Sequence, residues 1–465
     1  MTRPASGPRL LAGWAETRQV ADSAAHVDRY GPLPVLGAEL IGMVRAAGLL
    51  GRGGAWFPTG AKLAAVAAGR RTPVVVANGA EGEPASDKDK ALLTVAPHLV
   101  VDGMVLAAVA IGADEAILCV HRGSAVRAAI AQRHGDPVAI RLVEMPARFV
   151  ASEESALVNF LNTGEARPTE TPPRPYERGV RGRPTLVDNV ETLANVALIG
   201  RYGADWFRTA GTPEAPGTML VTVGGVAVRP GVREIPLGTT LSAALGYQRQ
   251  VVHSPAVMAG APPQDRIDWN SGGPREPADE RSNSGGGNGA ADSVGAVFGH
   301  GVTEPVSAVL VGGFGGNWLP LPAAADLPLT PGALAAAGGA LGVGMLLALP
   351  ARACGLAETA RILRYLAGES AMQCGPCMFG LAAIVDDVEG LTYGRPTVER
   401  LRYRLGMVGG RGACAHPDGA VRLAASALTV FADDVRAHAS GRPCAGARMA
   451  PVIRVPASGM GLGWR

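Results

Sequence analysis

The sequence predicts an α/β domain, then a small β domain, then a C-terminal helical domain. Three observations predict this order. Short apolar strands alternate with helical stretches up to about residue 215, β-branched residues and turn signals dominate from Gly217, and apolar residues recur at helical spacing after Ala351. We therefore expect domains at residues 1–215, 216–330 and 331–465. A polar, glycine-rich stretch at about 250–300 is expected to be a disordered insertion.

The expected elements of the first domain follow from periodicity. Residues 36–48 have a helical pattern, and a glycine-rich loop follows at residues 51–60. Beyond the loop we expect a short helix from Ala61, helices at 98–112 and 153–162, and strands at 73–77, 115–121 and 139–143. This alternation is typical of a parallel sheet with helical crossovers.

The two later domains differ from the first in their sequence patterns. Residues 217–241 contain apolar runs separated by Gly-Gly and Arg-Pro-Gly turns, and a further strand is expected at 307–311. Residues 331–350 carry no charge and are long enough to span a bilayer, but their many Gly and Ala residues favour a short helix, a turn and a buried strand at 344–349. Helices are then expected at 356–368, 375–388, 398–408 and 420–439.

Composition excludes several classes of protein. Net charge is +3 over 465 residues, which is too close to neutral to indicate binding to nucleic acid. Six Cys residues in this length do not make a disulfide scaffold, and the first residues lack the apolar core of a secretory signal. We therefore expect a cytoplasmic protein.

The loop Gly-Arg-Gly-Gly-Ala-Trp-Phe-Pro-Thr-Gly-Ala-Lys at residues 51–62 has the glycine density of a phosphate-binding loop. Glycine has no Cβ, so backbone N–H groups can approach an anion, and Arg52 and Lys62 add positive charge. No Gly-Lys-Ser/Thr follows, and the loop comes after a helix, whereas the Rossmann fingerprint follows a strand. The loop is either a phosphate-binding loop of another geometry or a structural turn.

Two further segments carry polar residues where ligands commonly bind. Residues 78–90 directly follow an expected strand, and α/β folds place ligands at the carboxyl ends of strands. Glu81 and Glu83 can accept hydrogen bonds from a ribose or an amide there, or can form a solvated acidic turn. Residues 182–192 open a helix, which Asp188 or Asn189 can cap, or either can bind the edge of a ring.

Three Cys residues lie in the C-terminal region. Cys374 and Cys377 form a Cys-x-x-Cys pair, and Cys414 follows later in the chain. Thiolates at this spacing can bind an iron–sulfur cluster or a zinc ion. A redox dithiol is the third alternative, although that motif normally lies beside a βαβ unit and these residues lie among expected helices.

These segments together resemble the flavin- and NADH-binding subunit of respiratory complex I, whose relatives occur in soluble NAD-linked hydrogenases and formate dehydrogenases. The resemblance runs from about Gly48 to Arg436. It rests on the motifs GRGGAWFPTGAK, NGAEGEPASDKDK, Glu153-Glu154, DNVET and ES…CGPC, in that order. The resemblance implies an FMN-binding α/β domain that is Rossmann-like without the standard fingerprint, a β-grasp-like SLBB domain, and a helical-bundle iron–sulfur domain.

The resemblance also implies roles for individual residues. FMN is expected to be bound by Gly51, Arg52, Gly53, Gly54, Lys62, Asn78, Glu153, Glu154, Asp188, Asn189 and Thr192. NAD(H) is expected to stack on Phe57, with Glu81 and Glu83 lining its site. The expected ligands of a 4Fe-4S or 3Fe-4S cluster are Cys374, Cys377 and Cys414.

The function implied is electron input: a hydride passes from NAD(P)H to FMN, and single electrons then pass to the cluster and to a partner. Expected partners are ferredoxin-like or thioredoxin-fold iron–sulfur proteins and a membrane module, which would place the chain at the inner face of the plasma membrane. One alternative is a redox relay that exchanges electrons with a partner and never binds nicotinamide. Another is a scaffold that has lost its cofactors.

The chain departs from the family pattern at both sites. The first Cys of the family's cluster loop is Ala371 here, so we expect His416, Cys354 or Cys444 as a substitute ligand, or no cluster. In the nucleotide site, the family's Asp is Ala80 and its two further aromatic residues are Ala65 and Arg174, with Tyr176 close by. Loss of two stacking faces is expected to weaken NADH binding by about 1–3 kcal/mol.

Overall fold

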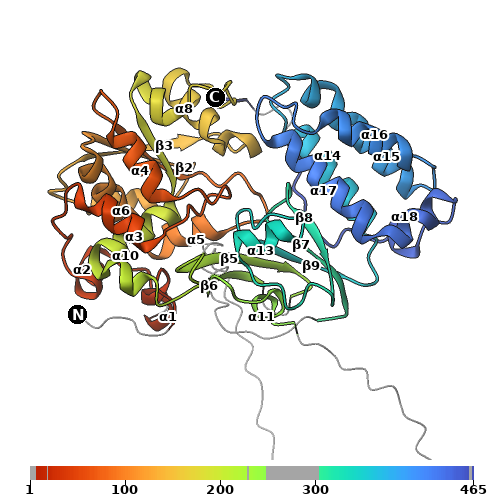
Figure 1. Ribbon diagram of the computed structural model, residues 1–465, viewed down its shortest axis with the longest axis horizontal. Helices are drawn as coiled ribbons and strands as arrows, with labels where there is room; N and C mark the ends of the chain where they lie inside the picture. The colour runs from red at the N-terminus through yellow and green to blue at the C-terminus, as the bar shows by residue number, and fades with distance from the viewer. Residues whose placement is uncertain (1–6, 18, 228–229, 248–302, 460–462) are drawn as a thin grey trace, which may run out of the picture.

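The computed structural model describes residues 7–17, 19–227, 230–247, 303–459 and 463–465. Figure 1 shows an α/β unit, a second sheet beneath it, and a group of helices on the opposite side from the α/β unit. The insertion expected at about 250–300 lies outside the described residues. The order of the three units along the chain is the predicted one.

A parallel sheet forms the centre of the first unit. Its strands run in the order β3-β2-β1-β4, and every neighbouring pair is parallel. The carboxyl ends of all four strands therefore lie at one edge, where Asn78 of β1 pairs with Asn189 of β4. The bounds are β1 Val74–Gly79, β2 Glu115–His121, β3 Ala139–Met145 and β4 Thr185–Asn189.

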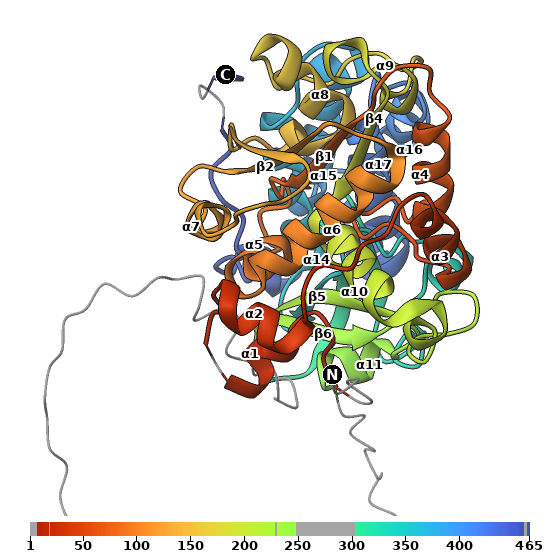
Figure 2. The same ribbon diagram turned by 90° about the vertical axis from the view of Figure 1, so that its left-hand side faces the viewer.

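Helices cover this sheet on both sides, as Figure 2 shows. The two longest, α6 and α10, are apolar over most of their surface and are almost entirely buried. They cross so closely that a Cβ on Gly103 of α6 would lie 1.8 Å from the carbonyl oxygen of Leu193 in α10. The helices are α1 Ala12–Thr17, α2 Ser23–Tyr30, α3 Glu39–Ala47, α4 Thr59–Ala67, α5 Lys88–Val95, α6 Pro97–Ile111, α7 Val126–Ala131, α8 Glu154–Thr163, α9 Pro175–Arg178 and α10 Val190–Phe207, with short helical turns η1 Phe149–Ser152 and η2 Val180–Gly182.

The second unit is a mixed five-stranded sheet in the order β6-β5-β9-β7-β8. Its central strand, β9, is the buried strand expected at 344–349, and it lies parallel to β5 and antiparallel to β7. The boundary expected after residue 330 is therefore wrong, because it removes the central strand from its own sheet. The bounds are β5 Thr218–Gly225, β6 Gly231–Pro236, β7 Val306–Val311, β8 Asn317–Pro320 and β9 Met345–Pro350, with helices α11 Leu241–Leu245 and α13 Pro331–Ala336.

Helices make up the third unit. The expected helix at 420–439 is two helices, because Phe431 leaves helical geometry (φ −105°, ψ 35°). This break directs the Phe431 ring into the core, where it contacts the Trp318 ring at 5.3 Å and lies against Gly355. The bounds are α14 Gly355–Gly368, η3 Pro376–Gly380, α15 Leu381–Thr392, α16 Val398–Val408, α17 His416–Val430, α18 Ala432–Ala439 and η4 Ala445–Arg448.

The C-terminal segment returns to the first unit. On its way it donates backbone N–H groups to two buried carboxylates of the third unit, Glu358 and Glu369. Its last residues then contact the first unit, where the N–H of Ala166 donates to the Trp464 carbonyl over 2.8 Å and the Arg148 guanidinium lies 4.1 Å from the centre of the Trp464 ring. The third unit is thus attached at both of its ends.

In the part of the chain that is described, no single helix is long and apolar enough to cross a membrane, and only α5 and α6 together, bent by 95°, have the required length and composition. The stretch at 331–350 forms α13 and β9, as predicted.

The close crossing of α6 and α10 gives a stability prediction. Gly103→Ala adds a methyl group against the Leu193 carbonyl, so we expect the free energy of unfolding to fall by about 1–3 kcal/mol although Ala is the better helix former. Thermal or chemical denaturation measures the change. The matched control is Gly42→Ala in α3, where nothing lies within 4 Å of the added Cβ and we expect a gain of up to about 1 kcal/mol. Equal effects of the two substitutions would contradict the prediction.

Candidate functional site

The predicted polar segments meet at the carboxyl edge of the parallel sheet. The side chain of Asn189 donates to the Asn78 carbonyl over 3.3 Å, and the side chain of Asn78 donates to the Ser152 carbonyl over 2.8 Å. The segment after β1, the start of α10 and the start of α8 are therefore adjacent. The glycine-rich loop joins them, because a Cβ on Gly53 would lie 3.3 Å from Cβ of Asn189. Open α/β sheets bind ligands at this edge.

The glycine-rich loop connects α3 to α4 and is pinned at its base. The N–H of Gly51 donates to the Phe57 carbonyl over 2.8 Å, and the N–H of Thr59 donates to the Leu49 carbonyl over 2.9 Å. At the tip, Gly54 and Trp56 have positive φ values of 103° and 55°. Within the described chain, the N–H groups of residues 53–56 have no hydrogen-bond partner. A run of free N–H groups in such a turn is the donor set of an anion site.

Arg52 does not offer a free cation to this site. Its side chain is only 1% exposed and donates to the carbonyls of Thr218, Pro216 and Leu50 at 2.7–3.3 Å. Burial lowers the pKa of Arg52 to about 10, partly offset by Glu191. The expectation that Arg52 supplies phosphate charge is therefore corrected: in this structure the guanidinium supports the loop from behind. The backbone N–H of Arg52 donates to Thr192, whose hydroxyl is fully buried, so Thr192 also fixes the loop.

Lys62 is the cation on the open side of the loop. Its Nζ atom donates to the Val187 carbonyl over 2.5 Å and lies 3.7 Å from Glu154 and 4.0 Å from Asp188. Asp188 is 7% exposed, and its Oδ2 atom is buried without a hydrogen-bond partner. Burial raises the pKa of Asp188 to about 6, against the lowering effect of Lys62. A buried acceptor without a donor is the expected state of a group whose partner is a ligand.

A buried charge network lies beneath the site, and our sequence prediction did not include it. Lys88 Nζ contacts Asp89 at 2.6 Å, Glu191 at 3.0 Å and the Asn189 side-chain oxygen at 3.2 Å. Glu191 also accepts the Leu220 N–H over 2.8 Å and lies 3.9 Å from Arg52. Burial opposes the charge of Lys88, but the surrounding carboxylates raise its pKa above the usual value. The sequence signal was a Glu within the apolar run that starts α10.

Glu83 is buried and Glu81 is half-buried, and both carboxyls are hydrogen-bonded inside the protein, contrary to the solvated-turn alternative. Glu81 accepts hydrogen bonds from the Ser86 hydroxyl and the Asp89 N–H. Burial raises its pKa to about 8, and the negative charge of the nearby Asp89 adds to this rise. Glu83 accepts the Phe314 N–H over 2.7 Å, and burial raises its pKa to about 7. These carboxyls therefore connect the segment after β1 to itself and to the second unit.

Glu153 and Glu154 have different roles: the first caps a helix and the second faces the site. Glu153 is the N-cap of α8 and accepts the N–H groups of Ser155 and Ala156. Burial raises its pKa. Glu154 lies one-third exposed beside Lys62. Asn189 likewise caps α10 by accepting the Glu191 N–H, so the capping role predicted for this position is confirmed.

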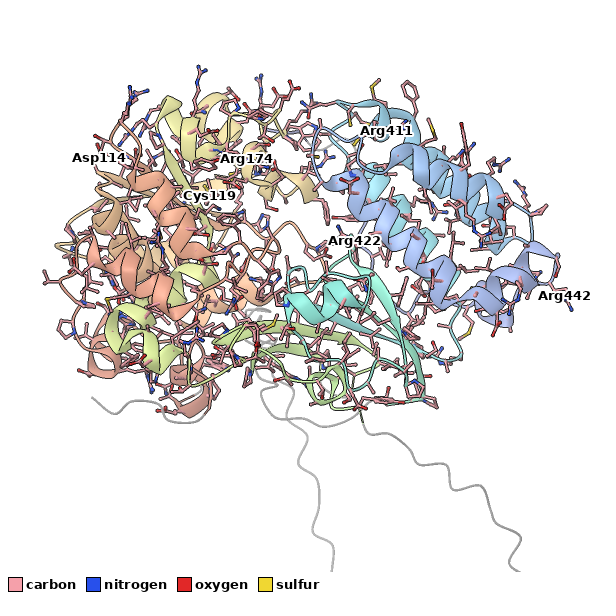
Figure 3. All side chains as sticks on the ribbon, in the orientation of Figure 1. Asp114, Cys119, Arg174, Arg411, Arg422 and Arg442 are labelled. Atoms are coloured by element: carbon pink, nitrogen blue, oxygen red, sulfur yellow. The ribbon has the colours of Figure 1, made fainter. Side chains whose placement is uncertain are left out.

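Phe57 is the aromatic side chain that the glycine-rich loop presents to the expected nucleotide face. Phe57 is 55% exposed at the end of the glycine-rich loop, so its ring is free to stack on a planar ligand. Ala65 is exposed on α4, and Ala80 is buried. Arg174 is exposed at the start of α9, where Figure 3 labels it, and Tyr176 is exposed within the same short helix.

The three clustered cysteines converge between α14, η3 and α17. Cys377 is buried, and burial together with the neighbouring thiols of Cys374 and Cys414 raises its pKa to about 12. Burial also raises the pKa of Cys414, and Glu153 of the first unit adds to this effect. The Cys414 thiol therefore lies on the side of the third unit that faces Glu153. Among the described residues these three thiols do not all lie within 4.8 Å of one another, which is compatible with ligands spread around a cluster, a group larger than a single ion.

Two of the expected substitute ligands are elsewhere. Cys354 and Cys444 lie at the opposite end of α14, whose 14 residues extend about 20 Å, so neither can reach Cys374. That expectation is therefore wrong. His416 remains close: its Nε2 bonds the Leu366 carbonyl at 2.8 Å, and its Nδ1 is buried without a partner. Ser370, beside Ala371, also has a buried hydroxyl without a partner.

Aromatic side chains connect the two candidate sites. The Phe314 ring, next to Glu83, contacts Tyr365 edge-on at 5.6 Å. Tyr365 contacts Phe149 at 6.1 Å, and Phe149 contacts His416 at 5.4 Å. Beside this row, the buried Glu369 carboxylate accepts hydrogen bonds from the Arg148 side chain and the Phe149 N–H, both at 3.0 Å. The three units therefore meet in one packed region between the sheet edge and the cysteines.

Family models match two parts of the chain. Residues 44–198 match the Nuo51 FMN-binding domain, and residues 357–438 match the NADH-ubiquinone oxidoreductase-F iron-sulfur binding region. The first range contains the sheet edge and the second contains all three clustered cysteines.

Whole-chain comparisons agree with these matches. The F subunit of the NADH-quinone oxidoreductase of Salmonella typhimurium is 30% identical over 426 residues, which cover 86% of this chain and 84% of that protein. The F subunit of the Streptomyces coelicolor enzyme is 29% identical, with 87% and 84% covered. A solved NAD+-reducing [NiFe]-hydrogenase in the H2-reduced state contains a similar chain, with a TM-score of 0.72 and 27% identity over 93% of this chain and 67% of that one.

The buried Glu83 gives a pH prediction. Its pKa of about 7 in the folded chain lies above its value of about 4.3 in an unfolded one, so its stabilising contribution is complete below about pH 4 and is lost as pH rises through about 7. Glu83→Gln removes this titration while it keeps an acceptor for the Phe314 N–H. Between about pH 5 and pH 8, we expect the wild type to lose about 3 kcal/mol relative to this variant.

Denaturation at the two pH values measures the difference. The exposed Glu214→Gln is the control and should follow the wild type at both values. A wild type and a Glu83→Gln variant with parallel pH profiles would show that Glu83 does not titrate in this range.

Proposed function

Because this chain belongs to the family of the F subunit of NADH-quinone oxidoreductase, we propose that it is the electron-input subunit of an NADH-linked oxidoreductase. It accepts a hydride from NADH on FMN and passes single electrons to an iron–sulfur cluster and a partner subunit. The observation that carries the proposal is the sheet edge, where free N–H groups of the glycine-rich loop, Lys62 and the unpartnered Asp188 carboxylate oxygen lie together.

The residues present fit FMN. The four N–H groups of residues 53–56 suit a phosphate, and the buried Asp188 oxygen suits an N–H donor on a polar ring. When bound, FMN supplies the conversion of a two-electron hydride into single electrons. The chain itself binds and orients: Arg52 and Thr192 fix the loop from behind, and Asn78 and Asn189 fix the floor. Lys62 keeps positive charge at the edge.

The nicotinamide nucleotide is proposed to stack on the exposed face of Phe57. Glu81 and Glu83 support the segment behind this face, because their carboxyls are committed to internal hydrogen bonds. With Ala65 and Arg174 at the positions where the family has aromatic residues, the site offers fewer stacking faces, so affinity for NADH is lower than a three-aromatic site would give. The exposed Arg174 favours a ligand with an additional phosphate.

The cysteine site fits a cluster with three thiolates and one other ligand. Cys374, Cys377 and Cys414 supply the thiolates, and His416 Nδ1 and Ser370 Oγ are nearby buried atoms without partners. We propose a 4Fe-4S or 3Fe-4S cluster there, within a C-terminal helical bundle, and we assign the five-stranded sheet as an SLBB-type domain. Exposed Met372, Met378 and Phe379 surround the cysteines and suit contact with another redox subunit, through which the chain acts as a peripheral subunit.

Anaerobic titration with NADH tests the function. We expect the purified chain to carry flavin, and NADH to bleach its visible absorbance, because the hydride is transferred to the flavin ring. Gly53→Val is expected to lower bound FMN, since its side chain would enter the gap beside Asn189, whereas Gly42→Ala should keep full flavin content.

Each other outcome identifies a different function. Flavin that remains oxidised with NADH but is reduced by reduced ferredoxin would replace this proposal with a redox relay that does not use nicotinamide. A chain that takes up neither FMN nor iron on reconstitution would show that the protein is a scaffold.

Iron content tests the cysteine site separately. Cys377→Ser and Cys414→Ser are each expected to lose most of the bound iron, because each removes one of three thiolates, while flavin content is unchanged. Iron analysis and low-temperature EPR of the reduced protein measure this loss. The control is Cys119→Ala, whose thiol is buried in β2 of the first unit, and it should keep its iron. Iron that persists in both serine variants would exclude this ligand set.

A further inference from the structure

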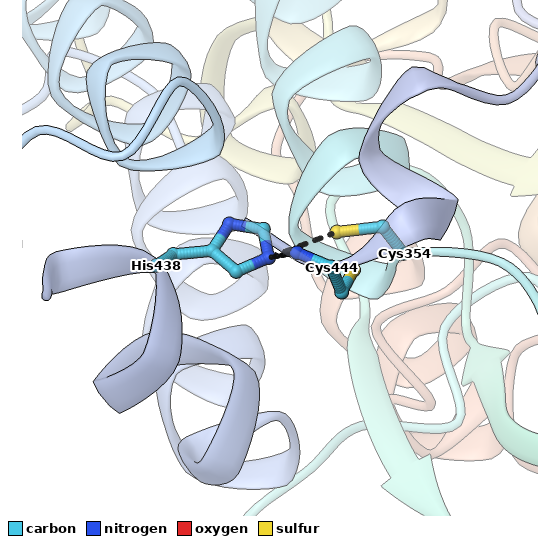
Figure 4. A group of neighbouring side chains, drawn as sticks. All are labelled: Cys354, His438 and Cys444. Atoms are coloured by element: carbon cyan, nitrogen blue, oxygen red, sulfur yellow. Dashed lines mark hydrogen bonds between the residues drawn. The ribbon is translucent and has the colours of Figure 1, made fainter. Parts of the chain in front are cut away.

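A second group of metal-binding side chains lies in the third unit, away from the cluster cysteines. Cys354 precedes α14, His438 lies in the last turn of α18, and Cys444 lies in the turn that follows. Their ligand atoms all lie within 4.8 Å of one another. Figure 4 shows the imidazole of His438 directed toward the two cysteines. Neither family resemblance nor the proposed electron transfer requires these residues.

The geometry is close to that of one shared ion. Cys354 Sγ and His438 Nε2 are 4.0 Å apart. Sulfur and nitrogen ligands of one tetrahedral zinc lie about 3.6 Å apart, because the Zn–S and Zn–N bonds are about 2.3 and 2.1 Å. A shift of a few tenths of an ångström therefore brings both atoms to bonding distance.

The hydrogen bonds of His438 show which of its nitrogens faces the site. The Cys444 backbone N–H donates to His438 Nε2 over 2.9 Å, so in this structure the lone pair of Nε2 is directed at the Cys444 backbone. The histidine is fully buried, and its Nδ1 atom has no hydrogen-bond partner in the described chain. This Nε2 lone pair is the donor that would bind a metal ion once the Cys444 N–H releases it.

We propose that Cys354, His438 and Cys444 bind one Zn2+ ion as a structural site. Two thiols and an imidazole are the borderline-soft donors that zinc prefers, and water or a backbone carbonyl can supply the fourth ligand. On binding, each thiol releases one proton and the Cys444 N–H gives up its bond to Nε2. Two thiolates and a divalent cation have no net charge, so the complex can remain buried.

The site joins three separate parts of the chain. It connects the start of α14 to the end of α18 and to the turn from which the C-terminal segment leaves. That segment then binds Glu358 and Glu369 before it reaches the first unit. Zinc therefore fixes the point from which the segment departs.

Metal analysis of the full chain, purified without chelator, tests the proposal. We expect about one zinc per chain in addition to iron, and loss of this zinc in Cys354→Ser, His438→Gln and Cys444→Ser with iron retained. Cys119→Ala should keep its zinc. A variant with Ser at positions 374, 377 and 414 should lose iron and keep zinc, which separates the two sites. In the wild type, Co2+ should replace zinc and give the d–d absorption of a tetrahedral thiolate site.

A second measurement does not depend on variants that fold. Removal of zinc from the wild type by a chelator should free two thiols for alkylation and increase tryptic cleavage after Arg448 and Arg454, which are exposed in the segment beyond the site. Absence of zinc from the wild type with both thiols free would overturn the proposal. A Cys354–Cys444 disulfide in peptides mapped without reduction would overturn it in favour of a redox pair.

Discussion

The arrangement of the flavin site depends on the buried ion pair between Lys88 and Glu191. Both side chains are about 1% exposed. Glu191 belongs to α10, but it also accepts a backbone N–H from β5 of the second unit and lies beside Arg52 of the glycine-rich loop. Lys88 Nζ also donates hydrogen bonds to Asp89 and to the side-chain oxygen of Asn189, which joins both residues to this network. Desolvation of these charges is costly, and loss of one partner leaves the other buried and unpaired, which typically costs about 3–5 kcal/mol.

This network separates the charges that build the site from those that face a ligand. The Arg52 guanidinium donates its hydrogen bonds to carbonyl oxygens behind the loop. The loop's own N–H groups therefore remain free at the front. Lys62 and Asp188 remain at the open side, where Lys62 limits the rise of the Asp188 pKa. A phosphate and a polar ring can then bind without rearrangement of the supporting charges, which is the benefit of a preorganised site.

Local sequence patterns predicted most of the elements and the segments of the site. Helices at 36–48 and 356–368 and the strand at 344–349 were recognisable because apolar spacing alone determines them. Patterns did not predict that β9 lies between β5 and β7, because strand order depends on contacts between distant segments. They missed the break at Phe431, since the apolar face of the helix continues through it. They also assigned Arg52 to a ligand, because spacing does not show whether a cation points outward or inward.

The cysteines illustrate the same limit. Cys374 and Cys377 were recognisable from their spacing, whereas Cys354, His438 and Cys444 are brought together only by the packing of α18 against the start of α14. From the sequence, Cys354 and Cys444 were candidate substitute ligands for the cluster, and the length of α14 excludes that role. Tertiary structure thus divides six cysteines into one clustered trio, one pair with a histidine, and a single buried thiol in β2.

The return of the C-terminal segment has a mechanical consequence. The helical unit is joined to the rest through the chain from β9 to α14 and again through Trp464, which bonds Ala166 and packs on Arg148. A domain that is attached by one linker can rotate about that linker, but a domain that is attached at two separated points resists rotation about either one. Tunnelling rates fall steeply with separation between donor and acceptor. Attachment at two points therefore opposes changes in the distance between the sheet edge and the cysteines.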